Sequence, residues 1–573
     1  MVAAAKGSVG PFFPKPLQVT KTKRLNHPYV SRVSCKATDD TQNLATRRDV
    51  LIGLGGLYSA TNLIDRTAYA KPITPPDLTK CELVDLPNPE NPTNCCSPLP
   101  KKIIDFRLPS PSSPLRTRRA AHLVDEDYVA KYAEAISLMK SLPEDDPRNF
   151  YQQANVHCAL PGPPAPPPPP CACCNGAYEQ VGFPKLKIDV HSGWLFFPWH
   201  SYHLYFYERI LGKLINDPTF ALPFWNWDSP SGMQMPYIFT DPKSPLYDQF
   251  RDQNHQPPTL LDLDYGAGDH NPTNANQLYS TKPTLFFGKP YRAGEDSSPG
   301  AGTIETTPHN NIHRWTGDPT QENTEDMGNF YSAARDPIFF CHHSNVDRMW
   351  TIWKTIPGGT RRDISDRDWL NSEFIFYNEN AELVRCKVRD CLDNRRLRYT
   401  YQNVEIPWLK SKPIPRRLGK KAAETKTALT PITAFPLVLD KTIVTVVSRP
   451  KKSRSRKEKE EEDEVLVIEG IEYDNGKFEK FDVFINDDVE MPSKPENTEF
   501  AGSFVNVSHK HAKKSKTRLI LGITELGGRD EATSENGVEN VLTRHHAPAR
   551  WLATRGTRHT HLLRKDGLTR PEY

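Results

Sequence analysis

Apolar residues recur at helical spacing in several stretches of the first 357 residues. In residues 121–141 the apolar positions share one face of a helix: Leu123, Tyr128, Tyr132, Ile136 and Met139. Residues 191–216 (HSGWLFFPWHSYHLYFYERILGKLIN) predict a second, aromatic-rich helix. Shorter helices are expected at 308–315 and after Asp336-Pro337. This part of the chain is therefore predicted to be mainly α.

Beyond residue 430 the pattern changes to short runs of β-branched and aromatic residues bounded by turn residues. Four such runs predict strands: FPLVLDKTIVTVVSR, EVLVIEGIEY, KFDVFIN and EFAGSFVNV. They predict a separate β-sandwich within residues 431–573. The tail after about residue 526 is basic and rich in histidine, and we expect it to lack further strands. Residues 411–430 are polar, basic and contain proline, which predicts an exposed linker.

The first 70 residues have the composition of a targeting segment. Residues 1–48 contain nine Lys or Arg but only two acidic residues, which is typical of a transit peptide. The twin arginine Arg47-Arg48 precedes a short apolar run, and Ala68-Tyr69-Ala70 offers an A-x-A processing site. An ordinary basic N-terminus is the alternative. The order of the three signals resembles a bipartite signal for the chloroplast and then the thylakoid lumen.

Composition narrows the classes of function. The 573 residues include 74 Lys and Arg against 70 Asp and Glu, so net charge does not favour nucleic acid as a partner. No run of about 18 apolar residues occurs, and we therefore expect no transmembrane segment. The 53 prolines predict a loop-rich protein with short elements, and eleven cysteines are too few for a small disulfide scaffold.

The histidines carry the candidate chemistry. His309 and His313 are four residues apart, so both imidazoles lie on one helix face and can reach one metal ion. Such a pair alone would most often be chance on a surface helix. Here other histidines stand in or beside aromatic runs: His191, His200, His342 and His343, with His157 before Cys158. Imidazoles without clustered carboxylates favour copper or zinc over magnesium or calcium.

Five long motifs resemble those of one family. They are HSGWLFFPWH (191–200), FYERILG (206–212), PFWNWD (223–228), TPHNNIHRWTG (307–317) and DPIFFCHHSNVDRMW (336–350). With them the chain resembles the plant polyphenol oxidases, the type-3 copper family of catechol oxidases and tyrosinases. The likeness extends through RDWLNSEFIFYNE and KFDVFIN. It implies five parts: targeting signals in 1–70, a dicopper catalytic domain with a four-helix bundle in 71–357, its extension in 358–410, the linker 411–430, and a jelly-roll-like shielding domain in 431–573.

The resemblance implies six copper ligands. The first copper takes His157, His191 and His200. The second takes His309, His313 and, of the adjacent pair, His343, which leaves His342 as a neighbour. In the family a thioether bond joins a cysteine to a ligand histidine, and the matching residues here are Cys174 and His191. Its two disulfides fall on Cys81 with Cys96 and on Cys95 with Cys158; a bridge between the adjacent Cys95 and Cys96 would strain the backbone.

The resemblance also implies the reaction. With copper and O2, o-diphenols are oxidised to o-quinones, and a monophenol must first lose its proton to a base. Glu305 matches an acid that holds a water near the site, although a carboxylate favoured by a helix N-terminus is the alternative. Asn310 matches the residue type that orients this water. Phe330 matches the aromatic gate over the second copper, with an ordinary core Phe as the alternative. Arg314 is expected at the pocket mouth, and Asp347 orients a ligand histidine or pairs with an arginine.

Three regions depart from the family pattern. The proline-rich insertion at 160–173 is expected to loop outward, because polyproline is extended. The region 277–284 is shorter than usual, and the tail after 526 is atypical. Two alternatives to an active oxidase therefore stay open: an inactive or single-copper product, and a dioxygen carrier like the related hemocyanins. The expected partners are small phenols and O2; the physiological phenol and the oligomeric state stay open.

Overall fold

The computed structural model describes residues 71–409 with gaps, and the strands and some turns of residues 430–564. The gaps in the first part are 82–94, 101, 160–177, 263–282, 296–299, 322 and 357–360. The targeting region 1–70, the linker residues 411–429 and the insertion 160–173 therefore lie outside the described residues, as does Cys174.

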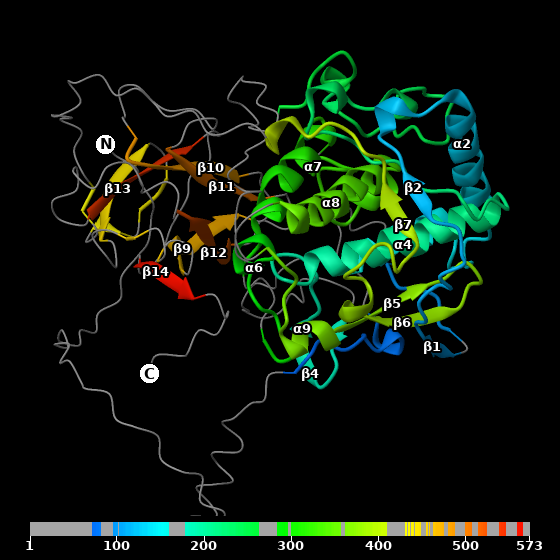
Figure 1. Cartoon of the computed structure of the whole chain (residues 1–573), viewed down its shortest axis with the longest axis horizontal. Coiled ribbons are helices and arrows are strands. Elements are labelled where there is room, and N and C mark those ends of the chain that lie inside the picture. Colours follow the sequence, from blue (N-terminus) through cyan, green and yellow to red (C-terminus); the bar gives the residue numbers. More distant parts are fainter. Residues whose placement is uncertain are drawn as a thin grey trace, which may run out of the picture. The chain divides into compact units, whose positions relative to one another are not determined.

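Helices dominate the described residues up to 371, as the apolar pattern predicts (Figure 1). They are α2 (Glu126–Ser141), α3 (Phe150–Cys158), α4 (Phe196–Leu214), α6 (Pro283–Phe286), α7 (Asn310–Thr316), α8 (Ile338–Thr355) and α9 (Arg367–Asn371). Asp125 caps α2 by accepting a hydrogen bond from the backbone N–H of Tyr128. Helices α4 and α8 pack against each other in the core and are buried along most of their length. Among the described residues, no helix is both long and apolar enough to cross a membrane.

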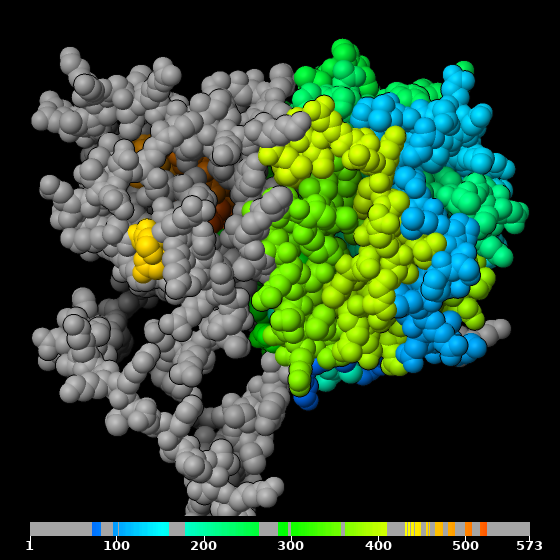
Figure 2. Space-filling view, viewed as in Figure 1, coloured from blue at the N-terminus to red at the C-terminus, as the bar shows by residue number. Residues whose placement is uncertain are grey.

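Short strands join the residues after 360 to residues 71–118, here called the N-terminal arm. Strand β1 (Ile103–Asp105) pairs in parallel with β6 (Leu383–Lys387), which pairs with β5 (Glu373–Tyr377). Strand β2 (Arg116–Arg118) pairs in parallel with β7 (Tyr399–Tyr401). Figure 2 shows the blue surface of the N-terminal strands beside the yellow-green surface of the later residues. The described residues of 358–410 thus complete the hydrophobic core of the helical part rather than forming a core of their own.

Two disulfides tie the N-terminal arm to the helical core. Cys81 is bonded to Cys96, and Cys95 is bonded to Cys158 at the end of α3. These are the pairs that the family resemblance implies. Because the second bond closes a long loop, it restricts the unfolded chain and places α3 against the arm.

A buried ion network fixes α4 against α8. Arg116 and Arg118, on one face of β2, both bond Glu208 of α4, at 2.7 and 2.8 Å. Arg118 also reaches Asp347 of α8 at 3.2 Å, and Asp347 accepts the hydroxyls of Tyr399 and Tyr401. Asp347 therefore pairs with an arginine, one of the two roles that the sequence left open. Removing one partner of such a buried network typically costs about 3–5 kcal/mol.

The C-terminal residues form two antiparallel sheets. One has the strand order β11-β10-β13-β8 and the other β12-β9-β14. Their bounds are Ile443–Ser448 (β8), Glu462–Asp474 (β9), Glu479–Ile485 (β10), Phe500–Asn506 (β11), Lys514–Gly522 (β12), Val538–His545 (β13) and His559–Arg564 (β14). Apolar side chains of both sheets share one core, which confirms the predicted β-sandwich.

The tail after residue 526 does not lack strands, contrary to the expectation from its composition. Strand β13 lies between β10 and β8, and β14 pairs with β9. Each of these tail strands hydrogen-bonds a partner far away in the sequence. Such non-local backbone pairing tolerates polar residues, and a basic composition therefore does not exclude it.

Candidate metal centre

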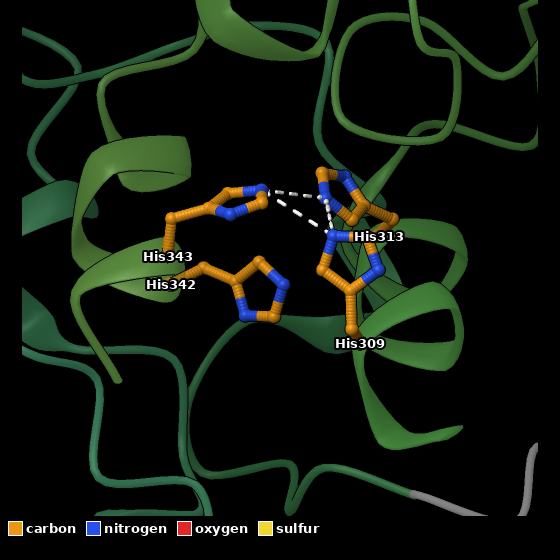
Figure 3. Close-up of side chains that lie close together, drawn as sticks. All are labelled: His309, His313, His342 and His343. Carbon is orange, nitrogen blue, oxygen red and sulfur yellow. Dashed lines mark hydrogen bonds between the residues drawn. The ribbon is translucent and has the colours of Figure 1, made fainter. Parts of the chain in front are cut away.

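Two histidine clusters lie in the helical core. His157 of α3, His191 before α4 and His200 of α4 bring one nitrogen each to within 4.8 Å of the others. The second cluster also brings one nitrogen of each histidine to within 4.8 Å of the others (Figure 3). It consists of His309 in the turn before α7, His313 of α7, and His342 and His343 of α8. The two clusters adjoin, because the rings of His200 and His343 stack with centroids 4.2 Å apart.

Backbone carbonyls orient two of the three histidines of the first cluster. The Nδ1 of His157 donates to the carbonyl of Phe330, and the Nδ1 of His200 donates to that of Phe196, both at 2.8 Å. Each bond fixes the tautomer, so that Nε2 carries the lone pair. The Nε2 atoms of His157 and His200 are buried and have no hydrogen-bond partner among the described residues. This is the arrangement that a metal ligand requires.

The second cluster converges on three Nε2 atoms. The Nε2 of His309 lies 3.1 Å from that of His313 and 3.4 Å from that of His343, and the last two are 3.2 Å apart (Figure 3). The Nδ1 of His313 donates to the carbonyl of Met327 at 2.8 Å. His342 lies beside them, its ring stacked on that of His309 with centroids 5.3 Å apart.

The protonation states suit a metal. Burial lowers the pKa values of five of these histidines well below the ordinary value, and that of His313 to about 4; the five are His157, His200, His309, His342 and His343. They are therefore neutral at physiological pH. Neutral imidazole nitrogens held close together, without a carboxylate among them, fit copper or zinc.

Glu305 and Asn310 flank the second cluster. A turn over Glu305–His309, broken by the extended backbone of Thr307, precedes α7. Glu305 accepts a hydrogen bond from the backbone N–H of Ser192 through Oε1, while its buried Oε2 has no partner among the described residues. Burial raises the pKa of Glu305 well above its ordinary value. The Oδ1 of Asn310 accepts from the Nδ1 of His309 at 2.9 Å.

Strands of the β-sandwich cover this side of the site. The Nδ2 of Asn310 donates to the carbonyl of Val505 in β11 at 3.0 Å. A cavity of about 50 Å³ lies here, lined from the helical core by His191, Glu305, Asn310 and Phe330, among others, and from the sandwich by Tyr473, Phe504 and Val505. Its volume exceeds the ~10–15 Å³ that one water needs. Glu305 and Asn310 therefore face a space that can hold water.

The structure shows contacts of two expected pocket residues. Phe330 packs on the first cluster, with its ring centroid 4.7 Å from that of His191 and 6.3 Å from that of His157, and it lines the cavity. The cause is local, since its own carbonyl holds the Nδ1 of His157. Arg314 donates to the side chain of Thr324, and the described residues that line the cavity do not include it.

A pair of carboxyl groups lies near the loop that follows α7. Asp248 and Asp326 hydrogen-bond each other, and burial, with the charge of Asp336 as a smaller cause, raises the pKa of Asp248 to about 6. Burial raises the pKa of Asp326 well above its ordinary value. Arg251 lies beside them but is bonded through two nitrogens to Asp336, at 2.6 and 2.7 Å. Two carboxylates this close cannot both ionise without cost.

We expect this pair to make stability depend on pH. Because the folded-state pKa of Asp248 is raised above 3.8, the folded chain binds the proton more tightly, and stability falls as pH rises from about 4 to about 6. Asp248→Asn should therefore raise the midpoint of thermal unfolding at pH 7.5, by the equivalent of roughly 1–2 kcal/mol. At pH 4 it should change little. Asp241→Asn, an exposed aspartate nearby, is the control; an equal gain at both pH values would contradict the prediction.

Family models match three consecutive parts of the chain. The common central domain of tyrosinase matches residues 147–356, the polyphenol oxidase middle domain 363–414, and the chloroplastic polyphenol oxidase C-terminal domain 435–532. A chloroplastic polyphenol oxidase of Malus domestica is 55% identical over 569 residues, which cover 93% of each chain. The chain belongs to the plant polyphenol oxidase family.

Other members support the same assignment. Aureusidin synthase of Antirrhinum majus is 52% identical, over 86% of this chain and 92% of that one. The solved structure of latent apple tyrosinase aligns with a TM-score of 0.73 and 54% identity, over 80% of this chain and 100% of that one. The protein is accordingly an oxidoreductase that carries out copper-dependent oxidation of phenols, as the motifs predict. Chloroplastic names among the relatives support a chloroplast location.

Sequence reasoning missed several residues that build the site. Met327, the backbone of Phe330 and the Arg116–Arg118–Glu208 network were not singled out. A carbonyl that orients a histidine leaves no mark on the sequence, because every residue has one. The two arginines of β2 alternate with Thr117, and this spacing is the one signal that both face the same side of a strand.

Proposed function

We propose that the two clusters hold two copper ions and that the enzyme uses O2 to convert o-diphenols into o-quinones. The first copper is held by His157, His191 and His200, and the second by His309, His313 and His343. The observation that supports this most is the pair of adjoining, buried sets of imidazole nitrogens. A pair of copper ions supplies two one-electron changes, which together match the two electrons that a diphenol gives up.

The protein's own residues position the phenol and handle its protons. The Phe330 ring, packed on His191, forms one wall of the cavity against which an aromatic substrate can stack. The unpartnered Oε2 of Glu305 and the amide of Asn310 border the space where a water can be held. A water held by these two groups can pass the proton of a monophenol on to the carboxylate of Glu305, whose raised pKa makes it the stronger proton acceptor, so we extend the proposal to monophenol hydroxylation.

Two further parts of the proposal rest on sequence motifs. The twin arginine and the A-x-A site support transfer into the thylakoid lumen. A thioether between Cys174 and His191 is supported by the family motif alone, because Cys174 lies outside the described residues. In the alternatives, this chain would be an inactive product or a dioxygen carrier; relatives named for polyphenol and catechol oxidase activity favour the enzyme.

Because sandwich strands lie over the cavity, we expect the intact chain to have a low rate of phenol oxidation. We expect a cut within 411–430 to raise the rate of o-quinone formation from catechol by at least tenfold, because it frees the β11 strand to leave Asn310. Copper analysis of the intact chain should give two ions per chain. If neither the intact nor the cut chain forms o-quinone at full copper loading, the proposed oxidase activity is contradicted. If both chains form o-quinone at equal rates, only the proposed shielding is contradicted.

A further inference from the structure

A single loop contacts one histidine of each cluster. Residues 324–332, here called the support loop, follow α7 and precede α8. The carbonyl of Met327 accepts from His313, and the carbonyl of Phe330 accepts from His157, each at 2.8 Å. The two carbonyls are three residues apart in the chain, whereas the two histidines belong to different clusters.

The support loop is buried and internally bonded. The N–H of Gly328 donates to the carbonyl of Thr324 at 3.0 Å. The hydroxyl of Ser332 donates to the carbonyl of Asp326 at 2.9 Å, and the N–H of Asp326 donates to Phe250 at 3.2 Å. Ser332 and Met327 are fully buried. A loop held at this many points moves as one unit.

Glycines let the support loop pack directly on the end of α7. Gly317, just after the helix that carries His313, would place a Cβ 2.4 Å from the backbone N of Gly328 and from the carbonyl O of Thr324. A Cβ on Gly328 would lie 2.4 Å from the same carbonyl oxygen. No side chain fits at either position, so any larger residue must displace the support loop.

We propose that the support loop couples the two metal sites, so that displacing it weakens both together. This inference rests on the proposed pair of coppers and adds the residues that make their binding interdependent. An imidazole whose Nδ1–H is bonded to a fixed acceptor keeps its tautomer and ring direction, and losing such a partner typically costs about 10–100-fold in metal affinity. Because Met327 and Phe330 lie on both sides of Gly328, one shift of the loop moves both acceptors. Gly328, Asp326 and Ser332 are thus positioning residues for His157 and His313.

The test is copper binding to the full-length Gly328→Ala variant, measured as copper per chain and by electron paramagnetic resonance. An isolated Cu(II) ion gives a signal, whereas two closely spaced, spin-coupled Cu(II) ions do not. We expect both sites to weaken about 10–100-fold together, so that a copper titration shows no step at one copper per chain and the isolated signal disappears at saturation. His313→Ala, which removes one ligand, should instead leave about one copper per chain and a strong isolated signal.

Two further variants keep the test decisive. Ser332→Ala removes only one hydrogen bond of the support loop and is expected to weaken both sites by about the same factor, up to roughly tenfold. Gly212→Ala creates a backbone clash of 2.8 Å at the far end of α4 and should leave copper binding unchanged. A step at one copper per chain with a strong isolated Cu(II) signal in Gly328→Ala or Ser332→Ala, or no loss of copper in either, would overturn the coupling. Fewer than two coppers in the saturated wild type would instead overturn the dicopper proposal itself.

Discussion

Replacing His309 with alanine is expected to remove one of two coppers and to abolish phenol oxidation. The Nε2 of His309 lies 3.1 Å from that of His313 and 3.4 Å from that of His343, so it is one of three converging donors. Two remaining imidazoles do not complete the coordination of the second copper. The first cluster keeps all three of its histidines, and copper per chain should fall from two to one.

His342, a further imidazole beside the second cluster, allows a stricter test of this prediction. Its ring lies 4.9 Å from that of His313, measured between centroids, and has no partner for either nitrogen among the described residues. The double variant His309→Ala/His342→Ala removes this imidazole as well, and we expect it to hold one copper per chain, as the single variant does. His203→Gln, which replaces a buried α4 imidazole outside both clusters, is the control. Two coppers per chain in the double variant would refute the ligand assignment.

The parts of the fold that could be predicted are those with a strong local pattern. The aromatic run of α4 and the run after Asp336-Pro337 are apolar for several turns, and both form long helices. Five of the six proposed ligand histidines stand in or shortly before these helices or in a short i, i+4 pair, and the family motifs implied the complete set. Helix α3, which carries His157, has nine residues and a mixed pattern. It depends on the Asn149 cap and on the Cys95–Cys158 bond, and it was not predicted.

What sequence reasoning missed depends on contacts between distant residues. Strand β13 forms because β10 and β8 offer hydrogen-bonding edges on either side, although its own composition is polar. Arg118 reaches Glu208 and Asp347, which lie 90 and 229 residues away. The position of Phe330 over the first cluster follows from its backbone bond to His157, a contact that no motif encodes. Local patterns and family motifs therefore pointed to the candidate ligands, whereas their orientation required the fold.

The second prediction tests the proposed hydroxylation of monophenols against the oxidation of diphenols. Asn310 bonds His309 through Oδ1 and Val505 through Nδ2, at 2.9 and 3.0 Å. When β11 leaves, the Nδ2 group is released next to the space that Glu305 borders. At neutral pH only about one phenol in a thousand is ionised, because its pKa is about 10. Monophenol hydroxylation therefore needs the base that a held water provides, whereas a diphenol depends on it less.

In the chain cut within 411–430, Asn310→Gly should lower the monophenol rate by about a hundredfold, within the ~10²–10⁴-fold range of a positioned base. At full copper loading the diphenol rate should change by no more than about threefold, because the carbonyl of Glu305, 3.2 Å from the Nδ1 of His309, still orients that imidazole. A monophenol and a diphenol with the same side chain should be compared, because equal size removes differences in access to the pocket. Asn310→Ala serves as the matched control, since it also deletes the amide but avoids the ~1 kcal/mol by which glycine weakens a helix relative to alanine. If both variants lose both activities equally, Asn310 acts by holding His309 in place, and the held water is not the base.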